Sequence, residues 1–284
     1  MAAIIIDGKA IAAKVKEDVC KRADRLRKRG HIPCLAMILA GEDPASVSYV
    51  KGKQKALLAA SMESRTLHLP GKVKEEELLS LIASLNADEK VHGILVQLPL
   101  PSHIREERVI CTVDPFKDVD CFNPHSLGKL LQGQAGFLPC TPQGIVVLLR
   151  SLKIPMAGRH VVVVGRSNIV GKPLAMLMAR KEQNATVTIC HTGTEDLPFF
   201  TRQADILVSA AGKPGLIKGD MIKAGAAVID VGITKSKDGR LLGDVIFDEA
   251  LEIAGWITPV PGGVGPMTIA MLMQNVVQAA EEKK

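Results

Sequence analysis

Residues 161–173 read Val-Val-Val-Val-Gly-Arg-Ser-Asn-Ile-Val-Gly-Lys-Pro, an apolar strand that runs into a glycine-containing turn and the start of a helix. This order is typical of a dinucleotide-binding βα unit. Gly165 allows the sharp turn, Gly171 allows the helix to pack closely on the strand, and the helix N-terminus offers N–H groups to a phosphate. An ordinary strand–turn–helix connection has the same pattern, so the neighbouring segments must decide.

Apolar runs recur after this stretch and alternate with segments of helical pattern. Strands are expected at residues 186–190, 204–210, 226–233 and 256–260, with a helix at 172–183. Such alternation indicates βαβ units in a parallel sheet covered on both faces. The sequence therefore predicts an α/β Rossmann-like domain in this half of the chain.

The end of the second expected strand bears on the choice of cofactor. An NAD-binding unit usually carries an acid about 20 residues after its glycines, to bind the ribose 2′-hydroxyl. Residues 188–194 instead read Thr-Ile-Cys-His-Thr-Gly-Thr. An acid at this position would repel a 2′-phosphate. Arg166 and Ser167 stand where the usual G-x-G-x-x-G motif of such units has its middle glycine, and both side chains donate to anionic oxygens. This favours NADP; the alternative is that these are solvated loop residues.

Composition limits the class of protein. The 284 residues are 47% hydrophobic and 23% charged, as in a soluble globular enzyme or binding protein with room for two domains. The N-terminus lacks a signal-peptide pattern and no apolar run is long enough to span a membrane, so we expect a cytoplasmic protein without a membrane partner. Neither a C-x-x-C pair nor histidines at i, i+4 spacing point to a metal site.

A net charge of +6 raises the question of nucleic-acid binding. The basic residues concentrate only in residues 21–29, on a helix whose apolar stripe is Ile11, Val15, Val19, Ala23 and Leu26 and which Gly30 would end. They are therefore expected on a solvated helix face. With 3% aromatic residues there is also little material for base stacking.

The first half of the chain is expected to form a separate small α/β domain. Its strands are expected at residues 35–40, 65–69 and 93–98, and its helices at 45–60 and 74–85. The boundary is expected near residues 139–142, where Thr141 can cap a helix that runs to about Leu152.

Three segments in this half contain polar residues that are candidates for a function. Tyr49 and Lys53 share a helix face, and a lysine among apolar neighbours is disposed to exchange protons; the alternative is a surface lysine. Gln97 ends an apolar strand, where the alternative is a core glutamine bonded to backbone. Asp118 and Asp120 lie in a turn-rich loop, where acids more often serve turns than ligands.

Taken together, six motifs resemble the bifunctional methylenetetrahydrofolate dehydrogenase/cyclohydrolase family. They follow one another along essentially the whole chain, at residues 49–53, 96–101, 117–120, 139–142, 165–173 and 259–268. The resemblance implies oxidation of 5,10-methylenetetrahydrofolate with NADP⁺ to the methenyl form, followed by its hydrolysis to 10-formyltetrahydrofolate in one-carbon metabolism. It also implies a homodimer built on the nucleotide domains.

The resemblance implies roles for individual residues of this chain that match the family's motifs. Lys53 resembles the catalytic lysine, Gln97 resembles the residue that holds it, Tyr49 would stack on the folate, and Asp120 would accept hydrogen bonds from the pterin amino edge. Leu98, Pro99, Pro261, Gly262 and Gly263 complete the implied substrate site. The implied NADP site comprises Thr141, Gly165, Arg166, Ser167, Val170, Gly171, His191, Thr192, Ile233 and Thr268, and no metal is implied.

The implied division of the chain is a folate-binding catalytic domain at residues 1–140 and an NADP-binding Rossmann-like domain at 141–266. The C-terminal helix, residues 267–284, would pack back on the first domain. Two departures from the family pattern stand out. Cys121 occupies a position where glycine is usual, and Thr192 stands where serine is commoner.

Three other readings of the sequence remain open. The chain could be a monofunctional dehydrogenase of the same family, or another two-domain NADP-linked dehydrogenase acting on a small hydroxy or keto substrate. Tyr49, Gln97 and Asp120 as a set argue against the second. A catalytically silent NADP-binding module is the third, and the intact Lys53 argues against it.

Overall fold

The computed structural model describes residues 2–134, 136–236 and 238–282. The chain forms two compact units. The six-stranded unit comprises the described residues up to Ala13, Leu130–Gln134 and Pro139–Thr268. The three-stranded unit comprises Lys14–Lys129, residues 136–138 and the described chain from Ile269 onward. The helices α1 (Gly8–Lys28) and α10 (Val264–Glu282) contribute residues to both units.

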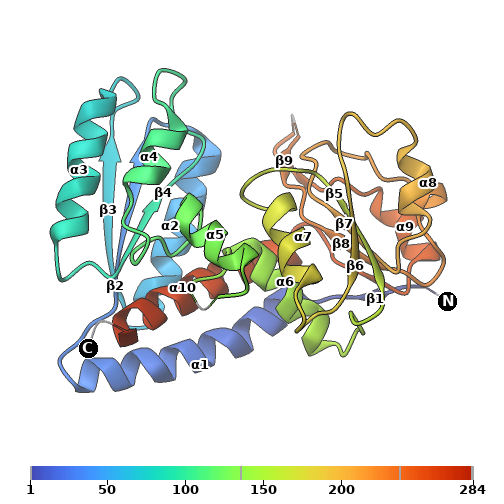
Figure 1. Cartoon of the computed structure of the whole chain (residues 1–284), viewed down its shortest axis with the longest axis horizontal. Coiled ribbons are helices and arrows are strands. Elements are labelled where there is room, and N and C mark those ends of the chain that lie inside the picture. Colours follow the sequence, from blue (N-terminus) through green and yellow to red (C-terminus); the bar gives the residue numbers. More distant parts are fainter. Residues whose placement is uncertain (1, 135, 237, 283–284) are drawn as a thin grey trace. The chain divides into compact units, whose positions relative to one another are not determined.

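The six-stranded unit is built on a parallel sheet in the order β1-β11-β8-β7-β5-β6. Its strands are β1 (Ile4–Ile5), β5 (His160–Val164), β6 (Thr186–Cys190), β7 (Ile206–Ser209), β8 (Ala227–Asp230) and β11 (Trp256–Ile257). Its helices are α6 (Cys140–Ser151), α7 (Gly171–Ala179), α8 (Leu197–Thr201) and α9 (Phe247–Ile253), with a 3₁₀ turn at Gly219–Met221. Figure 1 shows α6 and α7 on one side of this sheet and α8 and α9 on the other, which confirms the predicted Rossmann-like arrangement.

The order in which successive strands are added to this sheet reverses at β5. From β5 the chain passes through α7 to β6 on one side, and then crosses back to β7 on the other side. In open α/β sheets, ligands bind at the carboxyl ends of the strands beside such a switch point. The expected nucleotide turn, which follows β5, lies at this place.

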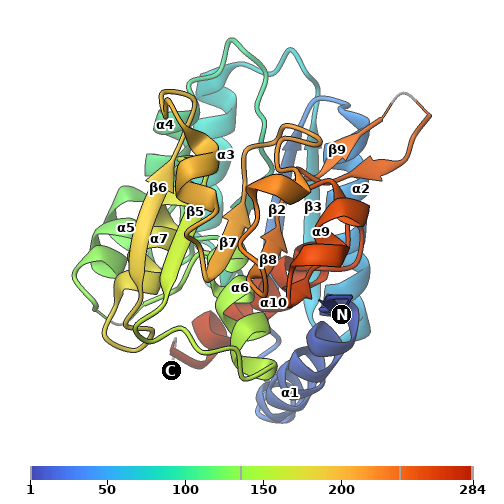
Figure 2. The same ribbon diagram turned by 90° about the vertical axis from the view of Figure 1, so that its right-hand side faces the viewer.

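The three-stranded unit has a parallel sheet in the order β3-β2-β4, with every residue of the central strand buried. The strands are β2 (Cys34–Ala40), β3 (Glu63–Leu69) and β4 (Gly93–Val96). The helices are α2 (Pro44–Ala59), α3 (Glu75–Ala87), α4 (Glu106–Thr112) and α5 (Pro124–Leu131). Alternate residues of β2 pack against α3 and α4, and Figure 2 shows α3 and α2 on opposite sides of β2 and β3.

The division of the chain differs from a single cut near residue 140. The N-terminal residues join the six-stranded unit because β1 pairs with β11, Ile4 opposite Trp256. The later part of α10 belongs to the three-stranded unit, where the Asn275 amide donates to the carbonyl oxygen of Val119 over 2.8 Å.

One helix start differs from the expectation. The N-cap position of α6 is occupied by Pro139, without a side-chain cap, so the prediction that Thr141 caps this helix is wrong. The chain enters the helix at Cys140 because Pro139 has an extended conformation, with ψ of 128°. The Thr141 hydroxyl lies 2.9 Å from that of Thr268 instead.

The sequence analysis did not identify several short elements. These are β1, the antiparallel pair β9 (Thr234–Lys235) and β10 (Leu241–Leu242), and the helices α4, α5, α8 and α9. Each has eight residues or fewer, too few to show a hydrophobic period. Among the described residues, no helix is long and apolar enough to cross a membrane.

Candidate active site

Helix α2 places Lys53 in the interior of the three-stranded unit. The helix begins at Pro44, and the Asp43 carboxylate caps it by accepting from the Ser46 N–H over 2.8 Å. Its buried face carries Lys53 together with Val50 and Leu57, so the Lys53 side chain is only 7% exposed. This burial excludes the surface-lysine alternative.

The amine of Lys53 is held by the strand end that carries Gln97. The Lys53 Nζ donates to Gln97 Oε1 over 3.1 Å, and Gln97 Nε2 donates to the Leu98 carbonyl over 2.7 Å. The Gln97 backbone N–H donates to Ile38 of β2, which fixes the residue just beyond β4. The amide is thus oriented by its own NH₂ group, with its oxygen directed at the lysine. The hydrogen bond that the family resemblance implies is present.

Tyr49 lies one turn before Lys53 but is less enclosed. Its side chain is 38% exposed, while Lys53 is buried, because a four-residue step rotates about 40° around a helix. Partial burial raises the pKa of the phenol. The ring therefore presents an accessible aromatic surface beside the lysine.

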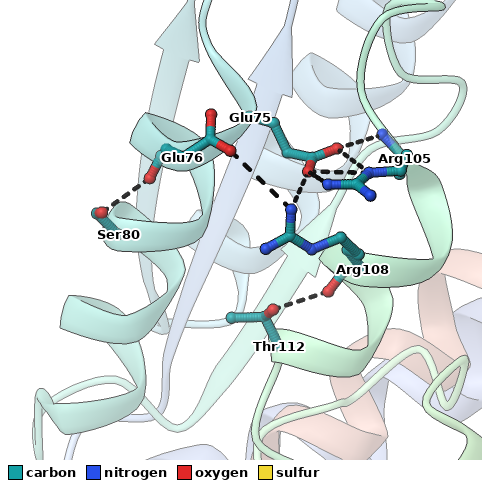
Figure 3. Close-up of polar contacts among 6 residues, drawn as sticks. All are labelled: Glu75, Glu76, Ser80, Arg105, Arg108 and Thr112. Atoms are coloured by element: carbon teal, nitrogen blue, oxygen red, sulfur yellow. Dashed lines mark hydrogen bonds and ion pairs between the residues drawn. The ribbon is translucent and has the colours of Figure 1, made fainter.

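An ion-pair cluster of Glu75, Arg105 and Arg108 holds the start of α4, the helix that follows the segment carrying Gln97 (Figure 3). Arg105 immediately precedes α4, and its backbone N–H and guanidinium both donate to the buried Glu75 carboxylate, the latter over 2.7 Å. Arg108 also pairs with Glu75. These guanidinium hydrogen bonds lower the pKa of Glu75 to about 2. The start of α4 is thereby tied to the start of α3.

The charged residues of the loop at 117–120 have different hydrogen-bond partners. Lys117 donates to the carbonyls of Leu85, Asn86 and Asp88 at the end of α3, over 2.7–2.9 Å. Asp118 is buried and accepts from the backbone N–H of Phe122 and of Asn123, just before α5. These two residues therefore stabilise the loop and its neighbours.

Asp120 differs from Asp118 in both exposure and partners. It is half-buried, and within the described chain no hydrogen bond reaches its carboxylate. The turn-acid interpretation thus fits Asp118, whereas Asp120 retains an available acceptor.

Cys121, the departure from the family pattern, has a left-handed backbone with φ of 61° and is fully buried. Glycine adopts this conformation without steric cost, which gives a physical reason for glycine at such a position. The Cys121 thiol lies 3.3 Å from the Phe137 carbonyl, and burial raises its pKa.

In the six-stranded unit, the turn after β5 is tightly packed. Gly165 has φ of 132°, and a Cβ on it would lie 2.3 Å from the Ala210 carbonyl oxygen. A Cβ on Gly171 would lie 2.1 Å from the carbonyl oxygen of Gly165. Both positions therefore require glycine. Gly171 permits close approach to the turn itself, rather than to the strand as expected.

The polar groups of this turn face solvent. Arg166 is exposed, and among the described residues its guanidinium forms no hydrogen bond or ion pair. The Ser167 hydroxyl accepts from the N–H groups of Val170 and Gly171 at the start of α7, over 3.2 and 3.3 Å. Because a hydroxyl both accepts and donates, Ser167 retains its proton for an anionic oxygen.

The end of β6 carries no acid. His191 Nδ1 accepts from the Gly193 N–H over 3.0 Å, which leaves Nε2 of the neutral ring as a donor. Thr192 is exposed, and no hydrogen bond to its side chain occurs in the described ranges. The chain thus offers donors here and no carboxylate before Glu195.

The remaining candidate residues also lie in the six-stranded unit. Gly262 has φ of 116°, and a Cβ on Gly8 would lie 1.8 Å from the Gly263 carbonyl oxygen, so the turn at Pro261 packs on the start of α1. Ile233 is 40% exposed in the loop after β8. The predicted substrate residues are therefore divided between the two units, with Pro261, Gly262 and Gly263 in the six-stranded unit.

The sequence analysis did not identify Asp230 and Asp244, two buried acids at the carboxyl edge of the six-stranded sheet. Asp230 could have been found from the sequence, because it is an acid that directly follows the apolar residues 226–229.

The described ranges contain no group of three or more histidine, cysteine, aspartate or glutamate side chains that could hold a metal ion.

One unit has a parallel sheet with a glycine turn at its switch point, and the other holds a buried lysine–glutamine pair. These features together are typical of a two-domain nucleotide-dependent enzyme. Two family models match the chain. Residues 6–120 match the catalytic domain of tetrahydrofolate dehydrogenase/cyclohydrolase, and residues 139–284 match its NAD(P)-binding domain. The chain belongs to the tetrahydrofolate dehydrogenase/cyclohydrolase family.

Individual relatives agree over nearly the full length. The bifunctional protein FolD of Exiguobacterium sibiricum is 54% identical over 279 residues, which cover 98% of this chain and 100% of that protein. The crystal structure of the bifunctional FolD dehydrogenase/cyclohydrolase of Campylobacter jejuni is 46% identical, with a TM-score of 0.97 and complete coverage of both chains. The Trypanosoma brucei dehydrogenase-cyclohydrolase, solved with NADP and an inhibitor, is 40% identical with a TM-score of 0.95, covering 99% of this chain and 98% of that one.

Proposed function

We propose that this chain oxidises 5,10-methylenetetrahydrofolate with NADP⁺ and hydrolyses the 5,10-methenyl product to 10-formyltetrahydrofolate, in one-carbon metabolism. Full-length membership of the family supports both activities. The observation that carries the hydrolytic half is the buried Lys53 amine, held at 3.1 Å by Gln97. A monofunctional dehydrogenase would have no need of this pair.

Lys53 is proposed to serve the proton transfers of hydrolysis. The attacking water must lose a proton and the departing ring nitrogen must gain one, and a positioned amine handles both. Gln97 Oε1 accepts one N–H of Lys53, so the rest of the amine is aimed by the strand end rather than left to rotate. Gln97 is accordingly proposed as a positioning residue for Lys53.

Asp120 and Tyr49 are proposed to bind the folate. The available Asp120 carboxylate suits the N–H donors of a pterin amino edge, and the accessible Tyr49 ring suits stacking. Leu98, Pro99, Pro261, Gly262 and Gly263 are proposed to complete the substrate site.

The residues after β5 and β6 fit NADP. Gly165 and Gly171 allow the tight backbone packing that forms the turn after β5. The exposed Arg166 with Ser167 and Thr192 suits a 2′-phosphate. When bound, the nicotinamide supplies the hydride acceptor. Val170, His191, Ile233, Thr141 and Thr268 are proposed to line the same site.

The three-stranded unit is proposed to carry folate catalysis and the six-stranded unit to bind the nucleotide. We further propose a homodimer in which the six-stranded units meet. Strand β6 is the edge of that sheet, and an unpaired strand edge is available for pairing with a second copy. Light scattering of the purified protein tests the dimer.

A spectrophotometric assay of the purified chain tests the function. Methylenetetrahydrofolate is supplied with NADP⁺ or with NAD⁺ to follow reduction of the nicotinamide, and methenyltetrahydrofolate is supplied alone to follow its hydrolysis. Both activities are expected, with NADP⁺ preferred. Dehydrogenase activity without hydrolysis would instead assign a monofunctional dehydrogenase, and no reaction of either folate would overturn the proposal.

A further inference from the structure

Two buried carboxylates occupy the carboxyl edge of the six-stranded sheet, outside the residues assigned above. Asp230, the last residue of β8, is 4% exposed, and Asp244, just beyond β10, is fully buried. Across the described ranges, neither forms an ion pair with a lysine, arginine or histidine. Burying an uncompensated carboxylate is costly, so their backbone contacts must explain them.

Asp244 binds the loop that follows β7. Its Oδ2 accepts from the Ser209 hydroxyl over 3.1 Å, from the Ala211 N–H over 2.7 Å and from the Gly212 N–H over 3.2 Å. Its Oδ1 is buried without a hydrogen-bond partner among the described residues. One carboxylate oxygen therefore fixes the strand end and the first turn after it.

Asp230 in turn fixes Asp244. The Asp230 carboxylate accepts from the backbone N–H groups of Asp244 over 3.0 Å, Val245 over 2.9 Å and Gly232 over 2.9 Å. A Cβ on Gly243 would lie 2.0 Å from Asp230 Oδ2, so the chain approaches this carboxylate as closely as glycine allows. The two acids thus link β8 to the loop after β7 through successive hydrogen bonds, from Asp230 to the backbone of Asp244 and from the Asp244 side chain to that loop.

The loop held by Asp244 borders the switch point of the sheet. Strands β5 and β7 are neighbours, and the carbonyl oxygen of Ala210 lies against Gly165, the glycine of the nucleotide turn. Gly232, held by Asp230, immediately precedes Ile233. Both loops thus end next to residues proposed for the cofactor site.

We propose that Asp230 and Asp244 are positioning residues for the nicotinamide cofactor, holding the loops after β7 and β8 in the conformation that receives it. They act through backbone N–H groups and do not touch the cofactor themselves. This inference rests on the proposed function, because it takes NADP to bind at this edge of the sheet.

Three variants of the full chain test the inference. Asp244→Ala removes all three acceptor contacts, whereas Asp244→Asn keeps one oxygen acceptor and removes the charge. Asp205→Asn is the matched control, because Asp205 also accepts from a backbone N–H and pairs with Lys223, but at the amino end of β7. The measurements are thermal unfolding, KM for NADP⁺, kcat of oxidation, and methenyltetrahydrofolate hydrolysis without NADP⁺.

We expect Asp244→Ala to raise KM for NADP⁺ by about tenfold to a hundredfold, because charge-assisted hydrogen bonds are among the stronger ones. Asp244→Asn should raise it by about three- to tenfold, since part of the acceptor geometry remains. Hydrolysis should stay within about twofold in both variants, because it consumes no nicotinamide. The Asp205→Asn control should leave KM for NADP⁺ within about twofold.

Two results would overturn the inference. One is a folded Asp244→Ala protein whose KM for NADP⁺ matches that of Asp205→Asn, and the other is an equal fall in oxidation and hydrolysis, which indicates general damage. If Asp244→Ala does not fold, an unchanged KM in Asp244→Asn overturns it equally. Failure of the unaltered chain to use NADP⁺ would instead overturn the proposed function, and this inference with it.

Discussion

The two units hold their candidate groups in opposite ways. In the three-stranded unit, Lys53 is 7% exposed and already hydrogen-bonded to Gln97. In the six-stranded unit, Arg166 is exposed and has no partner among the described residues. A group that moves protons benefits from a fixed position, whereas a group that binds an anion must keep its donors free until the ligand arrives. The contrast predicts that substitutions in the two units affect different quantities.

The largest expected effect comes from Lys53→Met, which keeps the apolar stem and deletes the amine. Because a positioned acid–base group contributes about 10²–10⁴-fold, hydrolysis of the methenyl substrate should fall by about that factor. Oxidation should fall less, since no proton leaves the methylene carbon with the hydride. Both rates are measured on one folded preparation, with NADP⁺ affinity as the control. Undiminished hydrolysis would remove Lys53 from the mechanism, and equal loss of both rates would make it a folate-binding residue.

Asp230 tests whether buried polar groups in the six-stranded unit affect stability as well as binding. Burial raises its pKa from 3.8 to about 6, so the folded chain binds the proton more tightly than the unfolded chain does. Its contribution to stability is therefore complete below the unfolded value and is lost as the pH rises towards about 6. The expected loss is on the order of 3 kcal/mol between about pH 4 and pH 6.

Chemical denaturation of the unaltered protein and of Asp230→Asn across this pH range measures the effect. The difference between their free energies of unfolding should shift by that amount in favour of Asp230→Asn as the pH rises. A difference that stays constant with pH would show that Asp230 has an ordinary pKa in the fold.

Asp120 and Asp118 make a matched pair within one loop. Asp120→Ala should weaken folate binding by about tenfold to a hundredfold, the loss of a charge-assisted contact, and both activities should decline while NADP⁺ affinity stays intact. Asp118→Ala should instead lower the melting temperature, because two backbone N–H groups lose their acceptor. Folate KM and thermal unfolding separate the two, and normal folate binding in Asp120→Ala would return it to a turn role.

Arg166→Ala tests the exposed cation in the turn after β5. We expect NADP⁺ to bind about tenfold to a hundredfold more weakly, while NAD⁺, which lacks the 2′-phosphate, changes little. Titration of both cofactors checks this. Stability should not change, because no contact of the guanidinium within the described chain is lost. Equal weakening of both cofactors would contradict recognition of the 2′-phosphate by Arg166.

The smallest expected effect concerns Cys121, whose left-handed backbone has φ of 61°. Cys121→Gly should be more stable than Cys121→Ala by about 1 kcal/mol, because a Cβ in this conformation meets the backbone and glycine has none. Both variants lose the buried thiol, so comparing them isolates the backbone. Urea denaturation of both proteins measures the difference, and an alanine variant of equal or higher stability would contradict it.

The sequence determined the parallel sheets, the glycine turn and the family, because apolar runs, glycine spacing and short motifs can be recognised locally in the chain. Gly165 and Gly171 were identified in this way, as were the strands on either side of them. The short elements β1, α8 and α9 were missed because a run of two to seven residues carries no readable period.

Only the tertiary structure decided how individual polar residues are used. The sequence placed Asp118 and Asp120 in one loop, but burial against the residues before α5 made one a structural acceptor and left the other available. It likewise left Lys53 open to a surface interpretation until α2 turned the side chain inward to Gln97, 44 residues away in the chain. Backbone preference depends on local sequence, whereas the cost of burying a charge depends on donors and acceptors that distant segments supply.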